Sequence, residues 1–277
     1  MFLPRISPTT WILALTLASC GPGPAPTATA MPVAVRVVPA TGDVPETALA
    51  RIEAEVAASL PVLQGTFDDL DLQPFVVFVH GARESMPEAL QAALHEDSPG
   101  FAILGRHQIH LVWGEIRRTG ADPRGVVAHE LVHELLDQYV APDGSHVPRW
   151  FHEGLAQLLA GDTYLGAREE DLVWRVGARR LASFGSLRDE FPRESSALRA
   201  AYAQSYSYVA WLERRYGLPL LLRVARSADE LTSFERALVA RTGRTTLELE
   251  DGWREHLLHG SGATWRVLSE QWFGLLM

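Results

Sequence analysis

The sequence predicts an α+β fold in which a small mixed α/β lobe precedes a mostly helical lobe. Two observations lead to this prediction. Strand-like and helix-like patterns alternate in the first part of the chain, whereas the chain beyond Asp122 has helical periodicity almost throughout. The 277 residues are 47% hydrophobic, enough to bury a substantial core in one domain or two closely joined lobes.

The first lobe is expected to contain three strand-forming segments and one helix. Alternating or continuous apolar residues indicate the strands, and a glycine between two of them indicates a tight hairpin about Gly105. The expected elements are a strand at 33–38, a helix at 44–60, a strand at 75–79, and a hairpin of strands 101–104 and 108–113.

The most informative segment is residues 129–133, whose sequence is HELVH. Residues four apart lie on one face of a helix, so His129 and His133 can present two imidazole nitrogens to a single Zn²⁺ ion. Zinc lowers the pKa of a bound water to about 7, and Glu130 beside it can take the proton as general base. The segment predicts a zinc-binding hydrolase site with one zinc ion per chain.

The flanking residues place this segment on a buried helix, which argues against a chance match to a short pattern. Residues 122–123 (Asp-Pro) supply an N-cap and a first-turn proline, and residues 141–144 (Ala-Pro-Asp-Gly) end the helix. Catalytic zinc usually has three protein ligands and an open fourth position. Glu153, in a second predicted helix at 148–161, is the best candidate for the third ligand.

These residues resemble the gluzincin clan of metallopeptidases and, within it, the small bacterial peptidase MA-like domains. The resemblance runs over roughly the last two thirds of the chain that would remain after removal of residues 1–19. In that family the HExxH pattern is followed, on the next helix, by a tryptophan, a glutamate ligand and a glycine, here Trp150, Glu153 and Gly154. The resemblance implies a zincin-like fold and a zinc site with the ligands His129, His133 and Glu153.

The resemblance also implies an edge strand above the HExxH helix. In zincin peptidases such a strand pairs with an extended substrate and grips its backbone amides. Residues 110–114 are the expected edge strand. In the other interpretation, this is an ordinary half-buried strand in which Ile109, Leu111 and Trp113 face the core while His110 and Val112 face outwards.

Residues 201–208 (AYAQSYSY) resemble the tyrosine-containing helix that these domains carry after the metal helices. A phenol hydroxyl can stabilise the negative charge of a tetrahedral intermediate, so Tyr202 and Tyr206 are catalytic candidates. In the alternative interpretation they are core residues of an amphipathic helix that runs to Tyr216 and is capped by Gly217.

One departure from the family pattern leaves the partners of the ligating histidines open. Some gluzincins carry an aspartate four residues after the glutamate ligand, where this chain has Gln157. Ligating histidines usually donate their second N–H group to a carboxylate or carbonyl. The candidates for this role are Glu134, Asp137 and Gln157. His146 and His152 are expected at the surface or behind the ligands, and Arg149 is assigned no role.

Residues 1–19 predict a bacterial lipoprotein signal peptide. Arg5 forms a positive n-region, and the apolar run at 11–18 is shorter than the ~20 residues needed to span a bilayer. Residues 17–20 (Leu-Ala-Ser-Cys) resemble the bacterial lipobox, so Cys20, the single cysteine, is the expected lipidation site. The alternatives are an ordinary secretory peptide or a retained anchor helix.

The domain organisation follows from this signal. Residues 20–32 are the lipidated cysteine and a flexible linker of Pro, Gly, Ala and Thr. Residues 33–277 are the zincin-like peptidase domain, with an α/β lobe at 33–120 and a helical lobe at 121–277. We expect the domain to be exported and lipid-anchored to the bacterial cell envelope, in the periplasm or at the outer surface. The net charge of −9 argues against nucleic acid as a partner.

The predicted function is a zinc-dependent peptidase that attacks the peptide bonds of a peptide or protein substrate with a zinc-activated water, Glu130 being the general base. The alternatives are a metal-binding envelope lipoprotein with a binding or structural role, and a zinc hydrolase of non-peptide amides such as those of the cell wall. The presence of Glu130 favours an enzyme, because a binding protein needs no proton acceptor at the metal.

Overall fold

The computed structural model describes residues 35–92, 98–140, 144–161, 169–229 and 232–260. The expected signal peptide, the lipidation site Cys20 and the linker lie outside these ranges. Within them the chain is α+β, with a small sheet in the first lobe and helices from there on, as predicted. No helix in this part of the chain is both long enough and apolar enough to cross a membrane.

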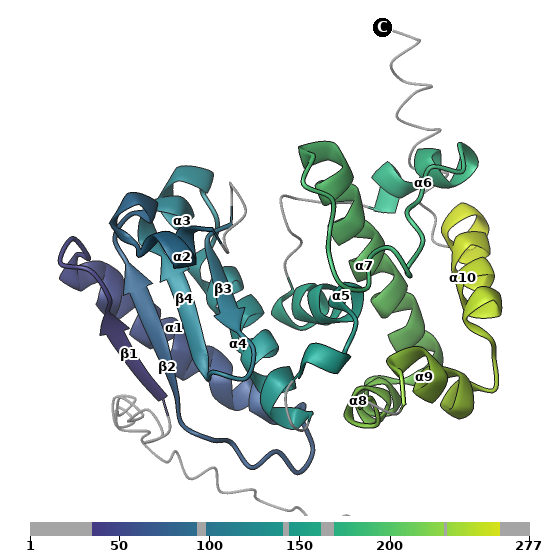
Figure 1. Ribbon diagram of the computed structural model, residues 1–277, viewed down its shortest axis with the longest axis horizontal. Coiled ribbons are helices and arrows are strands. Elements are labelled where there is room, and N and C mark those ends of the chain that lie inside the picture. The colour runs from purple at the N-terminus through teal and green to yellow at the C-terminus, as the bar shows by residue number, and fades with distance from the viewer. Residues whose placement is uncertain (1–34, 93–97, 141–143, 162–168, 230–231, 261–277) are drawn as a thin grey trace, which may run out of the picture. The chain divides into compact units, whose positions relative to one another are not determined.

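A four-stranded sheet forms the first lobe, in the spatial order β1-β2-β4-β3 (Figure 1). The strands β1 (Val35–Pro39), β2 (Phe75–His80) and β4 (Gln108–Val112) are parallel. Only β3 (Gly100–Ile103) is antiparallel, and it pairs with β4. The predicted strands and the hairpin about Gly105 are thereby confirmed.

The edge strand is β3, and the prediction that residues 110–114 form the edge is wrong. β4 pairs with β2 on one side and with β3 on the other, so it is an interior strand. Its expected end, Trp113 and Gly114, belongs instead to helix α3 (Trp113–Thr119). The parallel pairing of β4 with β2 occupies one edge of β4, and the tight turn then leaves β3 on the outside.

The outward face of β4 is also covered, contrary to the expectation that His110 and Val112 face outwards. The His110 ring stacks between Phe78 and Phe101, each with its centroid 5.0 Å away, and His110 Nδ1 lies 3.0 Å from His80 Nε2. Burial, with His80 nearby, lowers the pKa of His110 to about 4. Cross-strand ring stacking therefore replaces the solvent contact that an alternating pattern predicts.

The remaining elements are helical, and their N-caps and C-caps follow from the sequence. Asp122 accepts a hydrogen bond from Arg124 N at the start of α4, Pro148 precedes α5, and Gly161 ends α5 in the left-handed conformation. Beyond α3, these elements are α4 (Pro123–Tyr139), a 3₁₀ turn (Gly144–His146), α5 (Arg149–Ala160), α6 (Glu169–Gly177), α7 (Ser195–Tyr216), α8 (Leu218–Arg226), α9 (Phe234–Thr242), α10 (Thr246–Glu255) and a π-helical turn (His256–Gly260).

The first lobe has one long helix and two short helical elements besides α3. They are α1 (Glu46–Gln64), a 3₁₀ turn (Arg83–Ser85) and α2 (Glu88–Gln91). The first of these runs past Pro61, although the prediction ended it at residue 60. A proline removes one helical hydrogen bond, but Leu60 and Leu63 are both buried in the core, and their packing holds the last turn in place.

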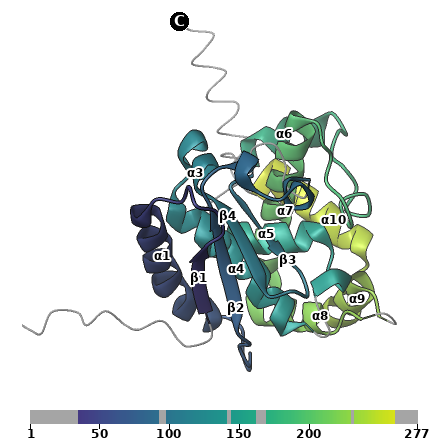
Figure 2. The same cartoon turned by 60° about the vertical axis from the view of Figure 1, so that its left-hand side comes forward.

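The helix α4 is the shared element of the two lobes. It contacts α1 and the strands β3 and β4 on one side and α5 on the other, and α5 in turn contacts α7. Figures 1 and 2 both show α4 between α1 and α5. Its apolar residues Leu131 and Leu135 are fully buried, whereas His129 and His133 on another face of the helix line a cleft beside α5.

A glycine allows the close approach of α5 and α7. A Cβ atom on Gly154 would lie 2.4 Å from the Ser205 carbonyl oxygen and 2.6 Å from Val209 Cγ2. Both of these neighbours are on α7, and one of them is backbone, so they have little room to move. Gly154 thereby sets the separation of the two helices at a point next to Glu153.

We expect the substitution Gly154→Ala to lower the free energy of unfolding by about 1–3 kcal/mol, because the added methyl group overpacks this interface. Urea denaturation of the wild type and the variant measures the change. Gly177→Ala is the matched control, since nothing lies within 4 Å of a Cβ at that helical position. Equal stability of both variants would contradict the proposed packing constraint.

Candidate metal centre and active-site cleft

Three predicted ligands come together between α4 and α5. His129 and His133 lie one turn apart on α4, and Glu153 faces them from α5. One potential ligand atom from each of these side chains lies within 4.8 Å of the others. The helix α5 presents Glu153 towards the two histidines because Phe151 and Leu155, on either side of Glu153 in the sequence, are fully buried in the core.

The spacing of these three atoms suits a tetrahedral zinc ion. The two Nε2 atoms are 3.1 Å apart, and Glu153 Oε2 lies 3.4 Å from Nε2 of His129 and 3.5 Å from Nε2 of His133. Donors that bind zinc at about 2.0–2.1 Å in tetrahedral geometry are separated by about 3.3 Å. Two imidazoles and one carboxylate are also a ligand set that zinc commonly takes, so the residues fit the ion.

The charge of the cluster also favours a cation. Burial opposes ionisation of Glu153, but hydrogen bonds with His129 and His133 outweigh it and hold the pKa of this carboxyl well below its usual range. Glu153 is 7% exposed, and it is therefore a buried anion. A buried anion of this kind is stabilised by a positive charge close by.

Glu130 lies beside the three candidate ligands, against the edge strand. Its carboxylate accepts a hydrogen bond from the backbone N–H of Ala102 on β3, while its Oε2 atom is buried without a hydrogen-bond partner among the described residues. Burial raises the pKa of Glu130, although the two neighbouring histidines act in the opposite direction. A buried carboxylate with an oxygen atom that has no hydrogen-bond partner among the described residues is suited to accept a proton from a neighbouring group.

A large cleft opens in front of these residues. Its volume is about 1390 Å³. Its lining includes the edge strand β3, residues of α4 and α5, and Tyr202 from α7. The cleft is larger than the ~300–1,000 Å³ of a typical small-molecule site, which suits an extended ligand.

The two candidate tyrosines differ in their positions. Tyr202 lines the cleft, and its hydroxyl group interacts with the guanidinium of Arg149. Tyr206 lies one turn further along α7, is half-buried, and is not among the described residues that line the cleft. Although the two side chains are four residues apart, only Tyr202 of the two lines the cleft.

Arg149 has a place in the site that sequence reasoning did not predict. Its Nε atom lies 3.5 Å from Glu153 Oε1, and its guanidinium stacks over the Phe191 ring at 5.2 Å. It therefore joins the outer oxygen of Glu153 to the Tyr202 hydroxyl across the floor of the cleft. The sequence does contain a signal for this role. Arg149 precedes Glu153 by four residues, which places both side chains on the same face of α5.

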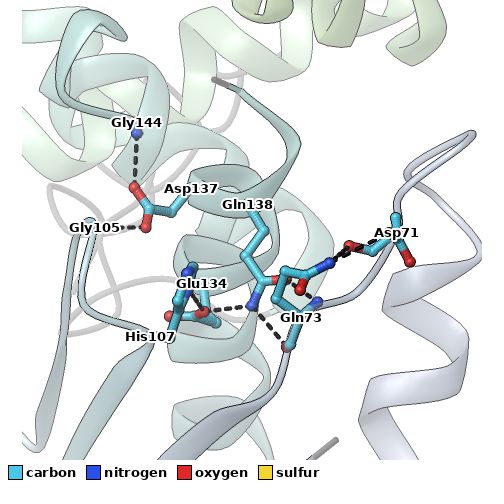
Figure 3. A network of polar contacts seen from close by, with 8 residues as sticks. All are labelled: Asp71, Gln73, Gly105, His107, Glu134, Asp137, Gln138 and Gly144. Atoms are coloured by element: carbon cyan, nitrogen blue, oxygen red, sulfur yellow. Dashed lines mark hydrogen bonds and ion pairs between the residues drawn. The ribbon is translucent and has the colours of Figure 1, made fainter. Parts of the chain in front are cut away.

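Each of the three candidate partners of His129 and His133 has contacts elsewhere in the described chain, and Asp137 accepts hydrogen bonds from Gly105 N and Gly144 N, both at 2.7 Å. The Gln157 amide donates to the backbone oxygens of Glu153 and Tyr202, both at 3.1 Å, and so joins α5 to α7. Glu134 accepts hydrogen bonds from His107 and Gln138 at the turn between β3 and β4, as Figure 3 shows.

His152 and His146 occupy different environments. His152 is buried, with its ring centroid 5.7 Å from that of His133, so it lies behind the ligands and not at the surface. Burial, with His133 nearby, lowers the pKa of His152 to about 4, so the ring is neutral near pH 7. His146 lies in the turn before α5 and is partly exposed.

A second group of potential ligands was not predicted. His107, Glu134 and Asp137 bring one ligand atom each within 4.8 Å of the others. His107 takes a positive φ of 54°, which is uncommon for a residue other than glycine. The carboxylates of this group already accept hydrogen bonds from the chain, as Figure 3 shows, and we treat it as a polar network.

Comparison with known proteins gives one family. A search of curated proteins yields no match. A family model described as the Peptidase MA superfamily matches residues 97–259, which is more than half of the chain. The match begins before β3 and includes α4, α5 and α7, and with them the candidate ligands, Glu130 and Tyr202. The chain therefore belongs to the Peptidase MA superfamily and is a peptidase-like enzyme.

Proposed function

We propose that this protein is a zinc-dependent peptidase of the gluzincin type. The observation that supports this most is the convergence of His129, His133 and Glu153 on one point, with atom separations of 3.1–3.5 Å and Glu130 beside them. A glutamate from the following helix as third ligand is what distinguishes the gluzincin arrangement. A bound zinc ion would supply a Lewis acid and lower the pKa of the attacking water.

The protein's own residues carry the proton through the reaction. Glu130 accepts a proton from the attacking water while the water oxygen forms a bond to the carbonyl carbon. As the carbon–nitrogen bond breaks, the same carboxyl group donates that proton to the leaving amine. The unpartnered Oε2 atom and the raised pKa of Glu130 both support this role.

Tyr202 is the proposed oxyanion donor. Its hydroxyl group lies on the wall of the cleft, held by Arg149, which is itself anchored against Glu153 and Phe191. A donor held in place before the reaction stabilises developing negative charge without reorganising. The positive charge of Arg149 near this hydroxyl would add to that stabilisation.

The edge strand β3 is the proposed substrate-binding strand. Because Val112 N donates to Pro99 O at 2.8 Å, the alternation of an antiparallel ladder directs the backbone groups of Phe101 towards β4. Those of Gly100 and Ala102 then face the cleft. A peptide laid along this edge would be bound through its backbone, with little dependence on its side chains.

We also propose that the enzyme is an envelope lipoprotein attached to the membrane through acyl chains on Cys20. The support is the sequence of residues 1–20, with its short apolar run and lipobox-like end. Acyl chains contribute about 0.8 kcal/mol per buried methylene to membrane binding. The Pro- and Gly-containing segment at 21–30 would then act as a spacer between the lipid and the catalytic domain.

Glu130→Gln tests the peptidase mechanism. The full-length wild type should bind one zinc per chain and cleave members of an unbiased peptide library. The variant should keep its zinc, because all three proposed ligands remain, and lose about 10²–10⁴-fold in kcat/KM, because the proton acceptor is gone. Zinc binding without cleavage by the wild type would favour a binding role or a non-peptide substrate, and absence of zinc binding would refute the proposed site.

Tyr202→Phe and Tyr206→Phe form a matched pair, since each removes one hydroxyl group from the same helix. Removing an oxyanion donor costs about 10²–10³-fold in kcat, so this loss is expected for Tyr202→Phe. The Tyr206 variant should change kcat far less, because its side chain does not line the cleft. Steady-state kinetics on one library-selected peptide measures both. Equal losses, or a larger loss at Tyr206, would contradict the assignment.

Cys20→Ala tests the membrane anchor. In bacteria grown with a palmitate analogue, the wild type should incorporate the label and sediment with membranes, whereas the variant should do neither, because no acceptor thiol remains. Glu130→Gln serves as the control and should be labelled like the wild type. A labelled Cys20→Ala protein, or an unlabelled wild type, would rule out lipidation at this residue.

A further inference from the structure

The carboxylate of Asp137 joins two loops to the helix that carries the histidines. Asp137 lies on α4 one turn beyond His133 and is 2% exposed. Its Oδ2 atom accepts a hydrogen bond from Gly105 N in the β3–β4 turn, and its Oδ1 atom accepts one from Gly144 N before α5, both at 2.7 Å. Figure 3 shows these two bonds leaving Asp137 in different directions.

The peptide of Gly144 continues this connection to α5. Its carbonyl oxygen lies 2.9 Å from His152 Nε2. A carbonyl oxygen only accepts hydrogen bonds, so Nε2 of this ring carries the hydrogen. His152 directly precedes Glu153 in α5. The N–H group of Gly144 thus donates to Asp137 on α4, the helix with the two histidine ligands. Its carbonyl oxygen accepts from His152 on α5, the helix with the glutamate ligand.

The fit around Gly144 shows that these three residues are closely packed. A Cβ atom at this position would lie 2.9 Å from His152 Cε1 and 3.2 Å from Asp137 Oδ1. Residue 144 has no positive φ, so the requirement for glycine comes from these contacts and not from the backbone conformation. Any side chain here would push Asp137 and His152 apart.

We propose that Asp137, Gly144 and His152 form a positioning clamp that sets the place of Glu153 relative to His129 and His133, and hence the affinity for zinc. This inference rests on the proposed zinc site. Ligand atoms spaced 3.1–3.5 Å apart tolerate little displacement of α5 against α4. Residues behind metal ligands typically contribute a factor of about 10–100 to metal affinity.

A neighbouring network on α4 offers a matched control. Gln138, the residue after Asp137, donates to Glu134 Oε1 at 2.6 Å and to Gln73 O at 3.2 Å, and accepts from Gln73 N at 2.7 Å. These bonds join α4 to the chain before β2, as Figure 3 shows. Gln138→Ala therefore removes polar contacts of α4 without touching the clamp.

Two substitutions of His152 distinguish the effect of losing its hydrogen-bond donor from the effect of losing the volume of its ring. Gln places an amide nitrogen close to the position of Nε2, whereas Asn is too short to reach Gly144 O.

Zinc affinity of the full-length chain is measured by competition with a chromophoric chelator. The visible spectrum after Co²⁺ substitution reports the coordination geometry, and melting of the zinc-free protein reports fold stability.

We expect His152→Asn and Gly144→Ala to weaken zinc binding about 10–100-fold and to alter the Co²⁺ spectrum. His152→Gln should restore most of the affinity, and Gln138→Ala should bind zinc like the wild type even where its melting temperature falls. Wild-type affinity in His152→Asn, or an equal loss in Gln138→Ala, would overturn the clamp while leaving the zinc site intact. A wild-type chain that binds no zinc would instead refute the proposed function on which the clamp rests.

Discussion

The structure depends on burying an anionic carboxylate, Glu153, between two imidazoles. Removing a carboxylate from water costs several kcal/mol unless other groups compensate for the lost hydration. Here the compensation comes from His129 and His133 on one side and Arg149 on the other. These groups lie on two helices, so the compensation requires that α4 and α5 are held in a defined relation.

The helix α4 meets this requirement because almost none of its surface is free. Its apolar residues pack on α1 and the sheet, and Glu130 contacts the edge strand. Its next two turns direct Glu134 and Asp137 to the β3–β4 turn and to the loop before α5. One helix therefore holds His129 and His133, the edge strand β3 and the start of α5, which carries Glu153, in a defined arrangement.

Local features were predictable where short-range geometry decides them. The bounds of α4 and α5 follow from an N-cap, prolines and a left-handed glycine, and the strands follow from their apolar patterns. Prediction was wrong where contacts distant in sequence decide. Core packing extends α1 past Pro61, and pairing with β2 makes β4 an interior strand, with its His110 stacked between two phenylalanines.

The sequence by itself determined that His129 and His133 lie on one face of a helix, because their four-residue spacing is close to the 3.6 residues of one helical turn. The family also followed from that motif and its flanks. Only the tertiary structure decided that Tyr202 and not Tyr206 lines the cleft, that Arg149 joins Tyr202 to Glu153, and that Gly144 links α4 to α5. Those relations depend on how separate helices pack. The packing depends on contacts between side chains that are far apart in the sequence, and a local periodic pattern does not predict such contacts.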